Sequence, residues 1–186
     1  RWQQYRERWT QVDAVIAISE ANRDAAHEYS GIPLDRIEVV YNGLDHDQFE
    51  PVEDAERLDT VRRRYDLPES FVLYLGSYDY RKNVDNLVRG FADVPEGTDL
   101  VLAGGIKGGR KRKLRALIEQ EGLDARVHFP GYIDDADLSA LYSAAEAFVY
   151  PSLAEGFGLQ VLEAMASGSP VLHSDRTSLP EVTDGA

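Results

Sequence analysis

The sequence predicts an α/β fold in which helices cover both faces of a parallel β-sheet. Apolar runs typical of strands alternate with segments of helical spacing along most of the 186 residues. Most of these runs are nearly continuous in apolar residues, as expected of parallel strands buried on both faces. They lie at 12–19, 37–43, 71–76, 98–105, 127–133, 145–150 and 169–174.

The N-terminal part of the chain predicts a short βαβ unit. Residues 1–10 are interpreted as the end of a helix, and a helix at 20–29 connects the first two apolar runs, with Ser19 as its N-cap. The polar segment 45–53 then predicts a linker, followed by a charged helix at 54–66. We therefore expect two structural units, of which the first is small.

The second unit begins with the strand at 71–76 and a loop that carries two cations. The apolar face of the next helix consists of Val84, Leu87, Val88 and Phe91. Asn83 is a suitable N-cap, so Arg81 and Lys82 stand beside the free N–H groups of the helix start. Solvated charge is one interpretation, but cations at this end are mildly unfavourable for a helix. A phosphate bound between them removes the mismatch, and we favour this interpretation.

The strand at 98–105 ends in two glycines, Gly104 and Gly105, which would let a nucleotide approach the backbone closely. The surrounding AGGIKG matches the dinucleotide fingerprint only in part, so a nicotinamide-dependent domain is not expected. Six of the nine residues 107–115 are basic. They are interpreted as the exposed side of a helix at 110–121, with a nucleic-acid patch as the alternative. The inward face of that helix consists of Leu114, Leu117 and Ile118.

The strand at 127–133 ends in a Pro-Gly turn before a helix at 134–145. Its inward face is predicted to consist of Leu138, Leu141 and Tyr142. Asp134, Asp135 and Asp137 could suggest a metal cluster, but acids in a first helical turn are more often caps. The last helix opens at 178–182, with Ser178 as N-cap and Glu181 completing a capping box.

The stretch 151–170 predicts a loop, a glycine turn and a helix. Helical spacing places three apolar residues on one face of this helix, namely Leu159, Leu162 and Ala166. Gly168 is a suitable helix end. Glu163 lies close to the apolar stripe and needs a hydrogen-bonding partner if it is buried. Either it reaches water at the helix edge, or it and Glu155 face a cleft where the free N–H groups of 156–159 attract an anion.

Composition excludes several classes of protein. The hydrophobic content of 43% supports a globular chain, and the formal net charge of −13 argues against a general binder of nucleic acids or anionic membranes. The absence of cysteine excludes disulfides and thiolate metal sites and is compatible with the cytosol. No apolar run approaches the roughly 20 residues that span a bilayer.

Glu155 and Glu163 enclose seven residues, and the segment EGFGLQVLEAMASGSPV closely resembles the E-x7-E segment of retaining glycosyltransferases of family 4, which have the GT-B fold. Two further family patterns match, G-x(4)-RKN from Gly76 and NG-x-D-x(3)-F-x-P at 42–51. The resemblance implies that 1–44 is the C-terminal part of the acceptor-side domain with the hinge. It implies that 45–186 is a truncated, Rossmann-like nucleotide-sugar-binding domain. The expected fold is thus an incomplete GT-B C-terminal domain, preceded by a βαβ remnant of the N-terminal domain.

The resemblance implies sugar transfer from a GDP- or UDP-sugar with retained configuration and without a metal. The expected catalytic residues are Arg81 and Lys82, which would neutralise the departing diphosphate, and Glu155, which would contact the sugar. Glu163 is an expected donor-binding residue and would accept from the ribose hydroxyls. The backbone near the nucleobase would involve Tyr132 and Ile133. The remaining expected donor-binding residues are Gly76, Gly156, Phe157, Gly158 and Leu159.

The YDYRKN loop resembles that of mannosyltransferases, which makes GDP-mannose the expected donor. The resemblance implies a glycan or lipid-linked acceptor, bound through a missing N-terminal domain. We expect a cytoplasmic protein without a transmembrane segment or nucleic-acid partner, in peripheral contact with the inner face of the membrane. The isolated chain is expected to be inactive. The alternative is a nucleotide-sugar-binding or interaction module without catalysis.

Overall fold

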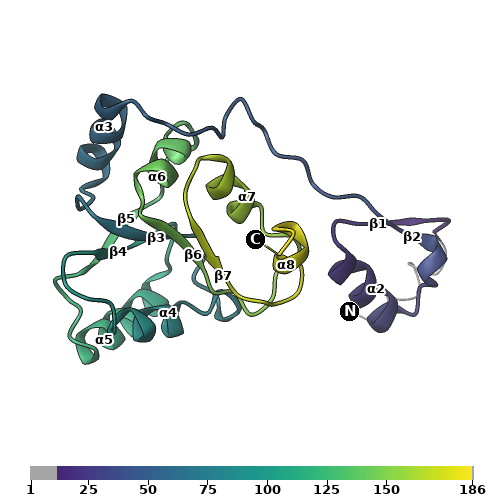
Figure 1. Cartoon of the computed structure of the whole chain (residues 1–186). Coiled ribbons are helices and arrows are strands. Elements are labelled where there is room, and N and C mark those ends of the chain that lie inside the picture. Colours follow the sequence, from purple (N-terminus) through teal and green to yellow (C-terminus); the bar gives the residue numbers. More distant parts are fainter. Residues whose placement is uncertain (1–11, 186) are drawn as a thin grey trace.

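The computed structural model describes residues 12–185, so the helix expected at 1–10 lies outside the described residues. It contains a small and a larger parallel sheet, joined by an extended segment (Figure 1). The small unit consists of β1 (Val15–Ala17), α2 (Glu20–Ser30), the 3₁₀ turn η1 (Leu34–Arg36) and β2 (Ile37–Val39). Ser19 caps α2 as predicted, because its side chain accepts from the backbone N–H of Asn22.

The larger unit follows the predicted order of strands and helices. Its strands are β3 (Phe71–Leu75), β4 (Asp99–Ala103), β5 (Val127–Gly131), β6 (Ala147–Tyr150) and β7 (Val171–His173). Its helices are α3 (Ala55–Tyr65), α4 (Val84–Phe91), α5 (Gly108–Gln120), α6 (Leu138–Ala144), α7 (Leu159–Ala166) and α8 (Leu179–Val182). Two 3₁₀ turns, η2 (Tyr80–Lys82) and η3 (Asp135–Asp137), precede α4 and α6.

The five strands of the larger sheet are all parallel, in the order β5-β4-β3-β6-β7. The chain enters at the central strand β3, winds outward through β4 to β5, and then returns to place β6 on the other side of β3. The strand order therefore reverses between β3 and β6. Ligands of open α/β sheets bind beyond the carboxyl ends of the strands at such a point.

Two layers of helices cover the larger sheet, as predicted. Helices α4 and α5 lie on one face, and α3, α6 and α7 lie on the other (Figure 1). The three inner strands β4, β3 and β6 supply most of the buried side chains of the sheet; Phe71, Leu73, Leu100, Leu102 and Phe148 are each 0% exposed. This core holds the strand ends rigidly, so the loops that leave them start from defined positions.

The small sheet differs from the prediction that its strands are covered on both faces. Ile16 in β1 is 68% exposed, and Val40 and Tyr41, just beyond β2, are also exposed. Within residues 12–185, the buried core of this sheet consists of Ala17, Ile32 and Ile37. Apolar continuity at 12–19 thus predicted the strand correctly but predicted its burial wrongly.

Three local predictions about helix ends and faces are wrong. Asn83 stands at the start of α4 in a left-handed conformation (φ 57°), and its side chain makes no capping bond. Ser178 likewise makes no capping bond at α8, which rules out a capping box with Glu181. The buried face of α7 consists of Val161 and Ala164 rather than the predicted stripe, because α7 contacts both α6 and β7.

The backbone around Gly104 requires a glycine at this position. Its φ is +107°, and a Cβ at this position would lie 2.2 Å from the carbonyl oxygen of Gly76. Gly105 has open space around its Cβ position. The close approach seen at Gly104 is thus that of the neighbouring strand end, and the approach of a nucleotide to these glycines stays a prediction.

Candidate functional site

The loops that leave β3 and β6 meet at the point where the strand order reverses. Hydrogen bonds join the loop 76–83 to the loop 151–158. The N–H of Leu153 donates to the carbonyl of Arg81 at 2.7 Å, and the side chain of Asn83 donates to the carbonyl of Pro151 at 3.1 Å. Asn83 therefore fixes the neighbouring loop instead of capping its own helix.

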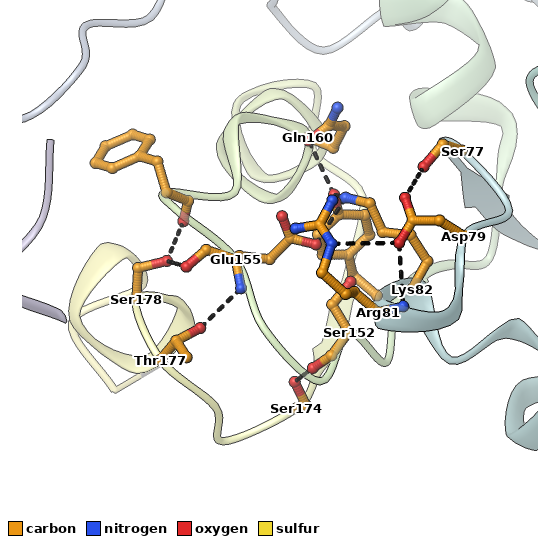
Figure 2. Close-up of polar contacts among 12 residues, drawn as sticks. Ser77, Asp79, Arg81, Lys82, Ser152, Glu155, Gln160, Ser174, Thr177 and Ser178 are labelled. Carbon is orange, nitrogen blue, oxygen red and sulfur yellow. Dashed lines mark hydrogen bonds and ion pairs between the residues drawn. The ribbon is translucent and has the colours of Figure 1, made fainter. Parts of the chain in front are cut away.

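Lys82 and Glu155, which are 73 residues apart, form an ion pair at this junction (Figure 2). The Nζ of Lys82 lies 2.6 Å from the Oε1 of Glu155, and both side chains are only 10% exposed. Lys82 also donates to the hydroxyl of Tyr150, at the end of β6. Burial strengthens such a pair because water screens it less. Two residues that were predicted separately as site residues thus meet at this junction.

Arg81 lies beside Lys82 but presents its side chain to solvent. Its Nε is 3.4 Å from the Oδ1 of Asp79, and the Arg81 side chain is 59% exposed. The hydroxyl of Ser77 lowers the pKa of Asp79, and the charges of Arg81 and Lys82 act in the same direction. Exposed pairs of this kind contribute little to stability. The guanidinium of Arg81 is therefore available to an incoming anion.

The loop 151–158 is hydrogen-bonded to residues 177–178, which directly precede α8. The backbone N–H of Glu155 donates to the hydroxyl of Thr177 at 2.9 Å, and the hydroxyl of Ser178 donates to the carbonyls of Glu155 and Phe157 (Figure 2). Sequence reasoning missed Thr177, and it interpreted Ser178 as a helix cap. No local signal in the sequence points to these contacts, because they join separate segments.

The start of α7 depends on Gly158 and on the small unit. Gly158 has a φ of +102°, and a Cβ there would lie 2.5 Å from a methyl carbon of Leu179. The carbonyl of Gly156 accepts from the side chains of Ser19 and Asn22 at 2.8 Å and 3.0 Å. Phe157 is buried, so a ligand can reach it only through its backbone. The free N–H groups at the start of α7 form a potential anion site.

Glu163 has the partner that its predicted position demanded. Its Oε2 accepts from the hydroxyl of Tyr142 on α6 at 2.9 Å. Burial raises the pKa of Glu163, the Tyr142 hydroxyl opposes that effect, and the charge of Asp135 adds to it. The carboxylate is half-buried and faces α6 rather than extending freely into water at the helix edge.

Beyond β5, the two residues expected at the nucleobase have different surroundings. Tyr132 is 69% exposed and Ile133 only 2%, so Ile133 offers a ligand its backbone alone. Leu159, at the start of α7, is half-buried, and Gly76 directly follows β3. The structure thus distributes the predicted site residues over the carboxyl ends of β3, β5 and β6.

The three aspartates near α6 form neither caps nor a metal site. Asp134 and Asp137 make no side-chain capping bond, and no group within residues 12–185 has the composition of a metal site. Instead the buried carboxylate of Asp137 accepts from Arg57, Arg64 and Tyr65, at 2.6, 2.6 and 2.8 Å. Burial alone would raise the pKa of Asp137, but the Tyr65 hydroxyl and the two guanidinium groups outweigh burial and lower it. This cluster connects α3 to α6.

Comparison with curated proteins identifies mannosyltransferases among the relatives. The chain is 36% identical over 176 residues to the serotype-specific mannosyltransferase WbdA of Escherichia coli, covering 91% of this chain and 22% of WbdA. It is 35% identical to the O-antigen chain mannosyltransferase B of Escherichia coli, covering 92% of this chain and 46% of that protein. The chain therefore spans half or less of the length of these relatives.

Solved structures share the fold over about half of their length. HepE of Anabaena in complex with UDP and glucose superposes with a TM-score of 0.82 at 25% identity, covering 91% of this chain and 46% of HepE. Sucrose-phosphate synthase of Thermosynechococcus elongatus gives a TM-score of 0.81 at 32% identity. The match covers 96% of this chain and 44% of the synthase.

Two family models match separate parts of the chain. The model described as Glycosyltransferase Family 4 matches residues 1–48, and the model described as Glycosyl transferases group 1 matches residues 59–185, more than half of the chain. The boundary between the two matches falls close to the linker expected at 45–53. The chain belongs to the glycosyl transferases group 1 family.

Proposed function

We propose that this chain carries the donor-binding part of a glycosyltransferase, which moves a sugar from a nucleoside diphosphate sugar to an acceptor with retention of configuration. The observation that carries the proposal is the convergence of Lys82 and Glu155 where the order of the parallel strands reverses. Family membership and the UDP-bound neighbour HepE support a nucleotide-sugar donor.

The diphosphate is proposed to lie between the loop 76–83 and the start of α7. The ammonium of Lys82 has three N–H donors, of which Glu155 and Tyr150 take two, so the third can serve a phosphate oxygen. Arg81 and the free N–H groups of α7 add positive potential. Charge grows on the departing diphosphate during transfer, and groups already in position would stabilise it without reorganisation.

Glu155 and Glu163 are proposed to hold the hydroxyl groups of the donor. Each has one carboxylate oxygen engaged within the protein, with Lys82 and Tyr142 respectively, and a second oxygen able to accept from a ligand. Glu155 would contact the transferred sugar, and Glu163 the ribose. The base would meet the backbone at 132–133. We propose that no metal takes part, since two of the three aspartates near α6, Asp134 and Asp137, are paired with arginines.

Mannose is the sugar that the relatives favour. WbdA and the O-antigen chain mannosyltransferase B are both named for mannosyl transfer, so we propose GDP-mannose as the first donor to test. A glycan or lipid-linked acceptor would bind through a part of the protein outside this chain. Among residues 12–185, no helix has the length and apolar character of a membrane span.

Calorimetry with GDP-mannose, UDP-glucose, GDP and UDP tests the proposal. We expect binding of at least one diphosphate, and we expect Arg81→Ala to weaken it by about 1–3 kcal/mol, the range for hydrogen bonds to charged groups. Arg89→Ala is the matched control, because Arg89 is an exposed arginine further along α4. Binding of the free nucleoside should change little in either variant. An equal loss for nucleoside and diphosphate in Arg81→Ala would contradict the assigned role.

A binding module without catalysis is the alternative function. Because the chain spans under half of the O-antigen relative, we expect nucleotide binding without turnover from this chain alone. Joining it to the remaining sequence of its protein should restore transfer to an acceptor. Tight binding without transfer by the whole protein would favour the module.

A further inference from the structure

We propose that two buried tyrosines, Tyr150 and Tyr142, position the two charged side chains at opposite ends of the donor site, Lys82 and Glu163. Tyr150 sets the ammonium of Lys82 at the diphosphate end, and Tyr142 sets the carboxylate of Glu163 at the ribose end. This inference rests on the proposed function and adds two positioning residues to it.

Tyr150 holds Lys82 through its hydroxyl. The hydroxyl oxygen accepts from the Nζ of Lys82, and the hydroxyl proton is donated to the Oε1 of Gln160 at 3.1 Å. With an acceptor on one side and a donor on the other, the hydroxyl has a single satisfied orientation.

A lysine needs such a support more than an arginine does. Its ammonium is a compact charge on a flexible four-carbon stem, and ordering the stem costs up to about 2 kcal/mol of side-chain entropy. The hydroxyl of Tyr150 and the carboxylate of Glu155 fix two of the three N–H directions of Lys82. The direction of the third N–H of Lys82 is thereby defined before a ligand binds. The side-chain entropy of the lysine is therefore lost on folding and not on ligand binding.

Tyr142 supports Glu163 in the same manner from the neighbouring helix. Its ring is fully buried in α6, and its hydroxyl donates to the Oε2 of Glu163 at 2.9 Å. That bond engages one carboxylate oxygen, Oε2, and fixes the carboxylate against α6, while Oε1 keeps its capacity to accept from a ligand. The hydroxyl also opposes the effect of burial on the pKa of Glu163, so it favours the charged form that accepts from hydroxyl groups.

Both tyrosines belong to one aromatic row. The Tyr142 ring meets Phe148 edge-on at 5.3 Å, and Phe148 stacks with Tyr150 at 5.6 Å. All three residues are 0% exposed. The row therefore holds the two hydroxyls at a fixed separation, as a rigid base shared by the two ends of the site.

Tyrosine-to-phenylalanine variants separate positioning from packing, because they keep the ring and remove only the hydroxyl. The variants are Tyr150→Phe and Tyr142→Phe. Tyr65→Phe is the matched control, since the Tyr65 hydroxyl also donates to a carboxylate, that of Asp137 at 2.8 Å, outside the proposed contacts of the diphosphate and the ribose. The probes are GDP or UDP, whichever binds the wild-type chain more tightly, the matching nucleoside, and the matching 2′,3′-dideoxynucleoside diphosphate.

Each variant has its own expected signature in calorimetry. Tyr150→Phe should bind the diphosphate about tenfold more weakly and the nucleoside as the wild type does. Tyr142→Phe should lose about tenfold for the diphosphate and the nucleoside alike, but little for the dideoxy compound, which lacks the ribose hydroxyls. Gln160→Leu, which removes the acceptor of the Tyr150 hydroxyl, should show a smaller loss confined to the two diphosphates.

The outcomes distinguish a failure of the tyrosine positioning role from a failure of the proposed donor-binding function. If the wild-type chain binds no nucleoside diphosphate, the proposed function fails and the inference falls with it. If the wild type binds the nucleoside diphosphate, and Tyr150→Phe and Tyr142→Phe bind it as tightly as the wild type does, only the positioning role is wrong. The positioning role is also wrong if Tyr150→Phe loses nucleoside and diphosphate to the same extent, or if Tyr65→Phe reproduces either signature.

Discussion

Glu163 shows how a single half-buried carboxylate links stability to function. It stays close to the core because Tyr142 satisfies one of its oxygens. Burial nevertheless penalises its charged form and raises its pKa. A residue kept in this environment destabilises the folded chain at neutral pH, which is typical of groups retained for a ligand rather than for folding.

The cost of that charge predicts a pH dependence. The folded pKa of Glu163 lies above the ordinary glutamate value of 4.5, so the folded state binds more protons than the unfolded state just above pH 4.5. The stabilising contribution of this group is therefore complete below that value and is lost as the pH rises through the folded pKa. We expect Glu163→Gln to gain stability relative to the wild type between about pH 4 and about pH 8, measured by urea unfolding.

Tyr142 provides the check on that prediction. Glutamine can still accept from the Tyr142 hydroxyl, so packing and hydrogen bonding remain while the charge is removed. A difference in unfolding free energy that stays constant over this pH range would show that Glu163 does not carry the desolvated charge.

At the scale of elements, the site is formed by loops whose shape the neighbouring elements impose. The loop after β3 is fixed by the loop after β6, and the latter is fixed in turn by the start of α8. The end of β4 contributes as well, because Gly104 packs directly on the carbonyl of Gly76. Substitutions in these supports should act on the loops without touching a ligand.

Gly104→Ala tests this close approach of two strand ends. We expect a loss of about 3 kcal/mol in unfolding free energy, because the methyl group meets backbone at 2.2 Å and the residue has a positive φ. Gly105→Ala is the matched control, with open space at its Cβ position. It should remain within about 0.5 kcal/mol of the wild type in the same urea titration. Similar losses in both variants would contradict the assigned role of Gly104.

At the scale of the whole molecule, the small unit depends on its contact with the larger one. In the part of the chain that the structure describes, its buried core consists of three residues, Ala17, Ile32 and Ile37. Cores of that size do not hold a fold by themselves. The carbonyl of Gly156 receives two hydrogen bonds from this unit, and the ring of Tyr41 lies 6.1 Å from that of Phe157. The contact therefore joins the small unit to the loop that carries Glu155.

Asn22→Ala removes one of these bonds and leaves the N-cap of α2 intact. We expect the backbone amides of β1 and β2 to exchange hydrogen about fivefold faster, since one net hydrogen bond contributes about 1 kcal/mol. The strands of the larger sheet should be unaffected. Glu28→Ala, at an exposed position on the same helix, is the control. Unchanged exchange in β1 and β2 would show that this contact does not stabilise the small unit.

The sequence alone determined the order and type of nearly every element in the larger unit, together with the residues that carry the family resemblance. Apolar runs, helical spacing and glycine turns are local signals, and they act within a few residues of where they occur. The positions of Arg81, Lys82, Glu155 and Glu163 as candidate site residues could be predicted for the same reason.

Only the tertiary structure decided which of these residues meet. The pairing of Lys82 with Glu155, the partner of Glu163, the arginine cluster at Asp137 and the contact of Gly104 with Gly76 all join distant segments. Such contacts depend on the order of the strands and on the packing of helices across them. A period of two or 3.6 residues reports which face of an element is buried, but not which neighbour lies against it.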